Sequence, residues 1–290
     1  VLKAISAKFK DESCAAWLGE NGAGHFVKTI HNGIEYADME MISEIYGILR
    51  DGAGMSAADI GAVFDTWNKG RLNSYLIEIT AEVLKAKDPK TKKAMVDMIV
   101  DRAGQKGTGK WSVIEAQMMG VPATAIEAAV AARSLSSFKD ERMAAEAAYG
   151  ELKTKFRAKP TDAFLRQLEL ALFAGKICAY AQGFAVMEAA SKEFSWSLPM
   201  ATISKIWRAG CIIRSQFLDT IAGSYRKKEK PVNLLVAPQF IKMMKQGHGP
   251  LRKTVALAAE AGIPVHALSS PLGYFDSYRQ GRGVANVLQA

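Results

Sequence analysis

The chain has 290 residues, 49% of them apolar and 23% charged, and its 38 Lys and Arg against 29 Asp and Glu give a net charge of +9. Apolar content this high can build a large core, which excludes a mainly disordered protein. Three dispersed cysteines are too few for a disulfide scaffold, and free thiols favour a reducing compartment such as the cytoplasm. There is no run of 18 apolar residues, so we expect no contact with a membrane.

The first 19 residues differ in pattern from the rest. Residues 14–18 (Cys-Ala-Ala-Trp-Leu) form a short apolar run typical of a β-strand, and the opening residues have a helical pattern. One strand cannot form a sheet by itself. We therefore expect residues 1–19 to be the remnant of another domain, and residues 20–290 to form the main domain.

From residue 20 onward the sequence predicts an all-α protein. Apolar residues recur at intervals of three and four, Ala is abundant and Pro is scarce. Ser56 and Asp59 resemble a helix-capping pair, which predicts that a helix starts there. We expect further helices over residues 25–49, 72–86, 89–102, 112–119, 123–135, 139–157, 161–194, 199–209, 211–226, 233–246, 248–261 and 272–279.

A weak internal repeat suggests two related halves. Trp67-Asn-Lys-Gly70 matches Trp207-Arg-Ala-Gly210, and each string follows a long helix by a similar interval. Two packed copies of one helical unit, over about residues 24–160 and 161–290, would explain an all-helical body of this size. The alternative is a chance match of two Trp-x-x-Gly strings.

Four polar residues share one face of the first long helix. Lys28, His31, Asn32 and Glu35 stand at positions i, i+3, i+4 and i+7, with Tyr36 beside them. We expect this face to point away from the apolar stripe of the same helix. Spacing alone also permits an ordinary solvated helix face.

The chemistry of this face is that of an acid–base site. A Lys whose pKa is lowered can act as a general base, and a Glu whose pKa is raised can act as a general acid. Gly33 lies inside the same helix, where Gly costs about 1 kcal/mol relative to Ala. Its presence predicts that another segment approaches the helix backbone closely.

A glycine-rich loop is the second candidate site. Gly104-x-x-x-x-Gly109-Lys110 fits the first seven positions of a nucleotide-binding P-loop. The eighth position, which should be Ser or Thr, is Trp111, and we expect a helix rather than a strand before the loop, so a P-loop phosphotransferase is disfavoured. Lys106 and Thr108 could still hold a phosphate, and the alternative is a plain turn.

The Lys-rich runs at 85–93 and 226–230 do not indicate a nucleic-acid partner. No aromatic residues alternate with the basic ones, as single-stranded nucleic-acid binding surfaces require. Solvated helix ends and linkers account for these runs.

Several strings together resemble the 6-phosphogluconate dehydrogenase family, the decarboxylating enzymes of the pentose phosphate pathway. The first long helix resembles the family signature over residues 22–39, and further matches lie at residues 103–111, 132–142, 206–215 and 261–264. The resemblance runs from about residue 14 to residue 290.

The resemblance implies a site and a reaction. Lys28 would be the base that takes the proton of the substrate's 3-hydroxyl, and Glu35 the acid that protonates C1 after CO₂ leaves. Asn32 would bind the reacting hydroxyl and His31 the carboxylate end. The residues implied for the 6-phosphate are Tyr36, Lys106, Thr108 and Arg133.

The resemblance also implies NADP as cofactor, 6-phosphogluconate as substrate, ribulose 5-phosphate and CO₂ as products, and a homodimer formed through the helical domain. No metal is expected. The family's glycine-rich NADP-binding Rossmann motif does not occur in this chain. Residues 1–19 resemble the last helix and strand of that domain, and the family's C-terminal tail is not found here either.

We therefore expect these 290 residues alone to be inactive, and the cofactor-binding residues stay unassigned. Two alternatives are a non-catalytic dimerisation module and another β-hydroxyacid dehydrogenase.

Overall fold

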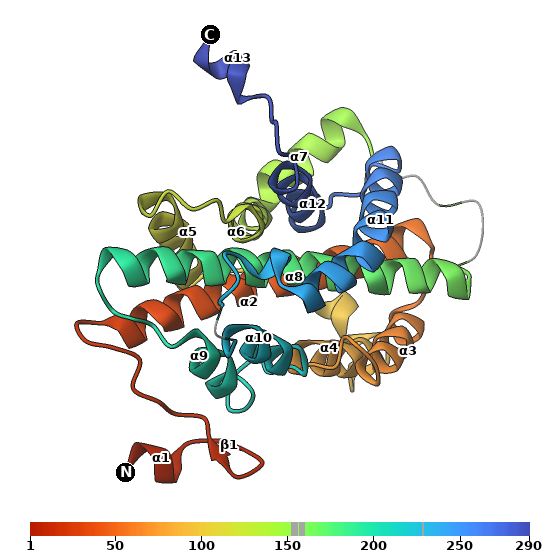
Figure 1. Ribbon diagram of the computed structural model, residues 1–290. Helices are drawn as coiled ribbons and strands as arrows, with labels where there is room; N and C mark the ends of the chain where they lie inside the picture. Colours follow the sequence, from red (N-terminus) through yellow and green to blue (C-terminus); the bar gives the residue numbers. More distant parts are fainter. Residues whose placement is uncertain (152–155, 157–159, 228) are drawn as a thin grey trace.

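Two long helices form the centre of the molecule in the computed structural model, which describes residues 1–151, 156, 160–227 and 229–290. Helix α2 (Ala23–Gly47) and helix α8 (Asp162–Glu193) lie side by side, and shorter helices cover them on both sides (Figure 1). Helix α2 continues into a π-helical segment, η1 (Ile48–Gly52). The fold class is all-α, as predicted.

The other helices surround this pair (Figure 1). Helices α5, α6 and α12 lie on one side of it, and α3, α4, α9 and α10 lie on the other. Their bounds are α1 (Leu2–Ile5), α3 (Ala57–Asn68), α4 (Tyr75–Lys85), η2 (Met95–Met98), α5 (Thr108–Met118), α6 (Thr124–Ser137), α7 (Lys139–Tyr149), α9 (Met200–Ile206), α10 (Phe217–Tyr225), η3 (Leu234–Val236), α11 (Pro238–Glu260), α12 (His266–Tyr278) and α13 (Ala285–Gln289).

Side-chain caps fix where several helices begin. The Ser56 hydroxyl accepts a hydrogen bond from the Asp59 backbone N–H at 3.2 Å and donates one to the Asp59 carboxylate at 2.6 Å. Thr161 caps α8 in the same way, because its hydroxyl accepts from the Phe164 N–H at 3.2 Å. A cap of this kind stabilises a helix by about 1 kcal/mol. The predicted capping pair at residues 56–59 is confirmed.

Glycines let α2 and α8 pack closely. A Cβ on Gly183 of α8 would lie 2.5 Å from the Ile34 side chain, and one on Gly175 would lie 2.5 Å from Met41 Sδ. Both contacts are shorter than real Cβ atoms show, so a larger residue at either position would force the Ile34 or Met41 side chain to move. The catalytic candidates on α2 are thus carried by an element held on one side by α8.

The α2–α8 contact also buries an ion pair. Lys176 Nζ of α8 lies 2.9 Å from Asp38 Oδ2 of α2, and the two side chains are 5% and 3% exposed. Taking one partner away from a buried pair leaves an uncompensated charge, which costs about 3–5 kcal/mol. The pair therefore fixes the alignment of the two central helices.

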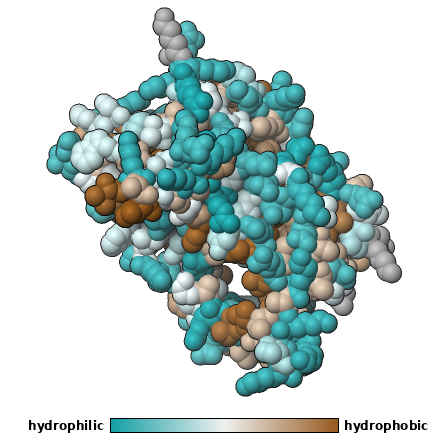
Figure 2. Space-filling model, turned by 90° about the horizontal axis from the view of Figure 1, so that it is seen from below, coloured by the Kyte–Doolittle hydropathy of each residue, from teal (hydrophilic) through white to brown (hydrophobic). Residues whose placement is uncertain are grey.

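Helix α8 is long and apolar enough by composition to cross a membrane, but it occupies the core of the described residues. Of its most apolar 18-residue window, 89% is buried inside the protein. The space-filling view in Figure 2 shows a mainly hydrophilic face with separate apolar patches. Burial of α8 against other helices accounts for its apolar composition.

The segments that follow the two Trp-x-x-Gly strings pair with each other. Ser74 and Ser215 form an isolated antiparallel bridge, in which the Tyr75 N–H donates to the Arg214 carbonyl at 3.1 Å. The Gln216 N–H donates in return to the Asn73 carbonyl at 3.4 Å. Two copies related by a two-fold axis would pair in this reciprocal manner. The repeat and its boundaries stay a prediction that this pairing favours.

Two secondary-structure predictions, a strand over residues 14–18 and a helix over residues 89–102, are wrong. Residues 14–18 form no strand among the described residues, and the chain instead forms a hairpin of β1 (Lys8–Phe9) and β2 (Glu12–Ser13). Residues 89–102 are not an α-helix. They contain a turn at residues 89–91, the 3₁₀ turn η2, and Ala94, which forms an isolated bridge with Lys87. Asp88 explains this, because its carboxylate accepts the Thr91 N–H at 2.6 Å and stabilises a turn instead.

The two helices expected over residues 233–261 are one helix, α11. Gly247 and Pro250 lie inside it without ending it. A Cβ on Gly247 would lie 2.8 Å from Ala174 Cβ of α8, so close packing on the core helix explains the glycine. Helix α7 ends at Tyr149, before Gly150 with φ of 76°, and residues 152–155 and 157 of the predicted helix lie outside the described residues.

Candidate active site

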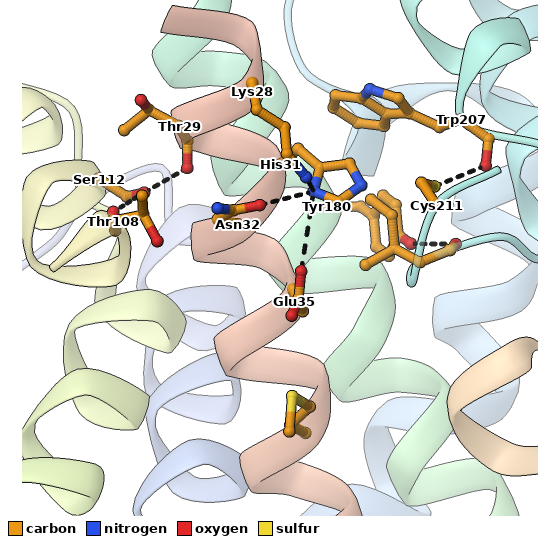
Figure 3. A network of polar contacts seen from close by, with 12 residues as sticks. Lys28, Thr29, His31, Asn32, Glu35, Thr108, Ser112, Tyr180, Trp207 and Cys211 are labelled. Atoms are coloured by element: carbon orange, nitrogen blue, oxygen red, sulfur yellow. Dashed lines mark hydrogen bonds and ion pairs between the residues drawn. The ribbon is translucent and has the colours of Figure 1, made fainter. Parts of the chain in front are cut away.

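The polar face of α2 forms a connected cluster (Figure 3). Lys28 Nζ lies 3.2 Å from His31 Nδ1, and Asn32 Oδ1 lies 3.1 Å from the same nitrogen. Glu35 Oε2 is 3.9 Å from it. The helical spacing therefore brings these four side chains together as predicted, with the imidazole at the centre.

The expectation that this face points away from the core is wrong at His31. Its side chain is 1% exposed, and its ring packs edge-on against Trp207 with centroids 5.3 Å apart and planes at 80°. Trp207 follows α9 and closes over this part of α2. Burial, and secondarily the charge of Lys28, lower the pKa of His31 to about 4, so the imidazole is neutral at neutral pH.

Glu35 is also withdrawn from solvent, with 15% of its side chain exposed. Burial raises the pKa of the Glu35 carboxyl, while the charges of Lys28 and Arg133 oppose the rise. A carboxyl with a raised pKa retains a proton nearer to neutral pH and can donate it. An ordinary solvated helix face, the alternative reading of this spacing, does not describe Glu35 or His31.

The glycine-rich loop ends directly beside α2. The Ser112 hydroxyl of α5 donates to the Thr29 carbonyl at 2.6 Å, and a Cβ on Gly33 would lie 2.7 Å from Ser112 Cβ and Oγ. The close approach predicted from Gly33 is confirmed. A Cβ on Gly109 would lie 2.6 Å from the ring of Tyr36, so the first turn of α5 rests on that ring.

Arg133 joins Tyr36 from the other side. This residue of α6 places its guanidinium 4.0 Å from the centroid of the Tyr36 ring, a cation–π contact. Thr108 begins α5 at the end of the loop, and Lys106 is exposed on the loop two residues earlier. Tyr36, Arg133 and the start of α5 are thus brought together, while no contact among the described residues fixes the Lys106 side chain.

The loop lacks the context of a P-loop. The chain before it contains the 3₁₀ turn η2 rather than a strand, and Trp111 at the metal-binding position is 57% exposed. The described part of the chain contains no group of His, Cys, Asp or Glu residues that could hold a metal ion.

Three residues around the site were not predicted from spacing. Trp207 buries His31, Ser112 fixes α5 to α2, and the Cys211 thiol donates to the Trp207 carbonyl at 3.0 Å. Burial raises the pKa of the Cys211 thiol to about 11, so this cysteine is not a thiolate near neutral pH. Two sequence signals pointed to the segment that contains Trp207, namely the repeated Trp-x-x-Gly string and the family resemblance at residues 206–215.

A lysine amine open to solvent and a mostly buried carboxyl share one helix face, next to a cationic side chain on a neighbouring helix. This arrangement defines a site suited to proton transfer on a small anionic molecule. The chain belongs to the 6-phosphogluconate dehydrogenase family. Its residues 24–290 match the family described as 6-phosphogluconate dehydrogenase, C-terminal domain.

Relatives with this name match the whole chain. It is 46% identical over 290 residues to a decarboxylating 6-phosphogluconate dehydrogenase of Bacillus licheniformis, covering 100% of this chain and 62% of the relative. In Bacillus subtilis, the NADP⁺-dependent decarboxylating enzyme is 46% identical and the NAD⁺-dependent one 44%, with the same coverage.

A solved structure of Plasmodium falciparum 6-phosphogluconate dehydrogenase superposes with a TM-score of 0.96 at 39% identity, over 99% of this chain and 62% of that one. It was described without ligand, with its cofactor NADP⁺ and with its substrate 6-phosphogluconate. The chain therefore spans about 62% of the length of the relatives that it matches.

Proposed function

We propose that this chain carries the substrate site of a decarboxylating 6-phosphogluconate dehydrogenase, which converts 6-phosphogluconate to ribulose 5-phosphate and CO₂. The observation that carries the proposal is the cluster of Lys28, His31 and Glu35, in which a lysine amine and a carboxyl of raised pKa share one partly buried helix face. Family membership and the named activities of the relatives support the choice of substrate.

The two titratable groups take opposite roles. Lys28 removes the proton of the 3-hydroxyl while C3 gives up a hydride, and the product is a β-keto acid. The bond between C1 and C2 then breaks and CO₂ leaves. The electron pair of that bond moves toward the C3 carbonyl, whose oxygen takes the proton back from Lys28, so that an enediol forms. Protonated Glu35 returns a proton to C1 of the shortened sugar. An amine and a carboxyl of raised pKa on one helix face suit this division of labour.

The remaining side chains bind the substrate in this proposal. Asn32 holds the reacting hydroxyl, and His31 supports the carboxylate end through the cluster it shares with Lys28. Tyr36, Lys106, Thr108 and Arg133 hold the 6-phosphate, for which the cations and the N–H groups at the start of α5 are suitable partners.

We propose NADP as the cofactor, which supplies a nicotinamide ring as hydride acceptor. Its binding residues are not assigned within this chain. We also propose that residues 1–19 belong to an N-terminal NADP-binding domain. The apolar run at 14–18 supports this, because it belongs to no described helix or strand and its Trp17 side chain is 74% exposed.

We further propose a homodimer through the helical domain. Trp111, Ile114 and Met118 lie at i, i+3 and i+7 on α5 and are 57%, 47% and 74% exposed, which is an apolar stripe suited to a protein partner. Sedimentation analysis tests this, with a monomer at micromolar concentration as the contradicting result. Such an enzyme belongs in the cytoplasm, where we place it.

The experiment is an assay of the full-length protein with 6-phosphogluconate and NADP⁺. We expect NADPH and CO₂ to form in equal amounts. NADPH without CO₂ would favour another β-hydroxyacid dehydrogenase, and neither product would favour a non-catalytic module. The 290-residue chain alone is expected to form no NADPH, and turnover by the pure 31.4 kDa species would contradict that part of the proposal.

A further inference from the structure

The imidazole of His31 is held on one edge only. Its Nδ1 is shared by Lys28 and Asn32, at 3.2 and 3.1 Å, whereas its Nε2 is buried without a hydrogen-bond partner among the described residues. A buried polar nitrogen without a partner is costly. Some other feature must therefore favour this position of the ring.

The indole of Trp207 is the aromatic group packed on that ring, edge-on at 5.3 Å. Trp207 is itself held in place, because Phe184 of α8 packs on it at 5.7 Å and Phe184 stacks on Tyr225 of α10 at 5.4 Å. The Trp207 carbonyl accepts the Cys211 thiol. Helices α2, α8 and α10 thus meet at one rigid aromatic cluster.

The charged form of His31 is disfavoured in this position. The titratable groups around the imidazole are Lys28 and Glu35 on its own helix and Cys211 after α9, while α8 contributes Phe184 to the cluster. An imidazolium would lose its water and would stand beside the ammonium of Lys28. A neutral imidazole either accepts from Lys28 at Nδ1 or donates from Nδ1 to Asn32 Oδ1, depending on its tautomer, and it tolerates an apolar neighbour.

We propose that Trp207 is a positioning residue for the acid–base site, whose indole excludes water from His31 and keeps that imidazole neutral and oriented toward Lys28. Its consequence for catalysis rests on the proposed function. The consequence for His31 itself does not, because it can be measured without substrate.

The first half of the chain offers a matched control. Trp67 occupies the same place in the other Trp-x-x-Gly string and is buried to the same extent, 5% exposed, as Trp207. It lines a hollow with Arg166 and Glu169 of α8 and is remote from His31 in its contacts. Substituting Trp67 removes an equal volume without uncovering the imidazole.

The test is a pH titration of the 290-residue chain by NMR with ¹⁵N-labelled histidine, which has only four histidines to assign. In the unaltered chain we expect His31 to titrate at about 4. In Trp207→Ala it should titrate at least one pH unit higher, toward the ordinary value of about 6.5. Trp207→Phe and Trp67→Ala should retain the low midpoint.

An unchanged His31 midpoint in Trp207→Ala, or an equal rise in Trp67→Ala, would overturn the proposal. If Trp207→Ala does not fold, Trp207→Leu replaces it, and its midpoint is expected to rise in the same direction. Leu retains apolar volume but leaves a gap through which water reaches the imidazole.

A kinetic readout connects the residue to the reaction. In the full-length enzyme, Trp207→Ala should lower kcat about tenfold or more with little change in the KM for NADP⁺, and Trp207→Phe should restore most of it. An inactive unaltered enzyme would refute the proposed function and leave the NMR result to decide the role of Trp207. Normal kcat in an active enzyme carrying Trp207→Ala would refute the positioning role alone.

Discussion

The contact between Gly33 and Ser112 joins α2 to α5, the helix that follows the glycine-rich loop, and Gly33→Ala tests it. The new Cβ would lie 2.7 Å from Ser112 Cβ and Oγ and 3.1 Å from Ile126 Cγ2. Ser112 Cβ is attached directly to the α5 backbone, so the clash cannot be relieved by rotating a long side chain. Helix α5 must move away from α2, and its hydrogen bond to the Thr29 carbonyl lengthens.

The magnitude follows from three opposing contributions. Replacing a helix-interior Gly by Ala stabilises by about 1 kcal/mol. Overpacking a close contact costs about 1–3 kcal/mol, and a weakened hydrogen bond costs about 1 kcal/mol more. We expect a net loss of about 1–3 kcal/mol in the free energy of unfolding. Gly47→Ala is the matched control, because Gly47 lies in the same helix with nothing within 4 Å of the added Cβ.

Urea denaturation followed by circular dichroism measures both variants. Gly33→Ala should unfold at a lower urea concentration than the unaltered chain, and Gly47→Ala at an equal or higher one. The double variant Gly33→Ala with Ser112→Gly should recover part of the loss. If Gly33→Ala is as stable as Gly47→Ala, the close approach of α5 to α2 is refuted.

Three further predictions concern buried charges. Lys176→Met leaves Asp38 unpaired, so we expect a loss of about 3–5 kcal/mol in the free energy of unfolding by urea. The double variant of Lys176→Met with Asp38→Leu should lose less. An equal or larger loss in the double variant would contradict the pairing. The folded pKa of His31, about 4, lies below its unfolded value, so the stability of the protein should fall by roughly 3 kcal/mol as the pH decreases from 6.5 to 4. Thermal unfolding measures this fall. His31→Gln should reduce the fall, whereas the control His266→Gln, at an exposed position, should not. Because the folded pKa of Glu35 is raised, its ionisation opposes folding above pH 4.5, so Glu35→Gln should raise the melting temperature at pH 7 and change it little at pH 4.

The sequence was sufficient for the helical architecture because helix periodicity and capping are local. The pattern of α2 and the cap at Ser56 depend on residues within a few positions of each other. The turn at Asp88 is local as well, because the Asp88 carboxylate accepts the N–H of a residue three positions later. This turn signal could have been used to reject the helix that was predicted over residues 89–102. The sequence predicted two helices where the structure has α11. Gly247 is explained by its packing on Ala174 of α8, and a contact with a segment so distant in the sequence does not appear in the local pattern.

The candidate site was predictable from the sequence only where it depends on local spacing. Spacing alone placed Lys28, His31 and Glu35 on one face, and the family resemblance assigned their roles. The burial of His31 and Glu35 was not predictable, whereas Lys28 is exposed. The burial of His31 depends on Trp207, which folds back from the other half of the chain. Burial matters most for function, because it lowers the pKa of His31 and raises that of Glu35.

The central claim is that Lys28 and Glu35 are the acid–base pair of a decarboxylating dehydrogenase. The most direct test measures kcat for 6-phosphogluconate in the full-length protein carrying Lys28→Met or Glu35→Gln. The exposed pair Lys253→Met and Glu260→Gln serves as control for loss of the same charges. We predict that each site variant folds and loses at least about a hundredfold in kcat, while both controls keep normal turnover. Near-normal turnover in either folded site variant would contradict the role assigned to that residue.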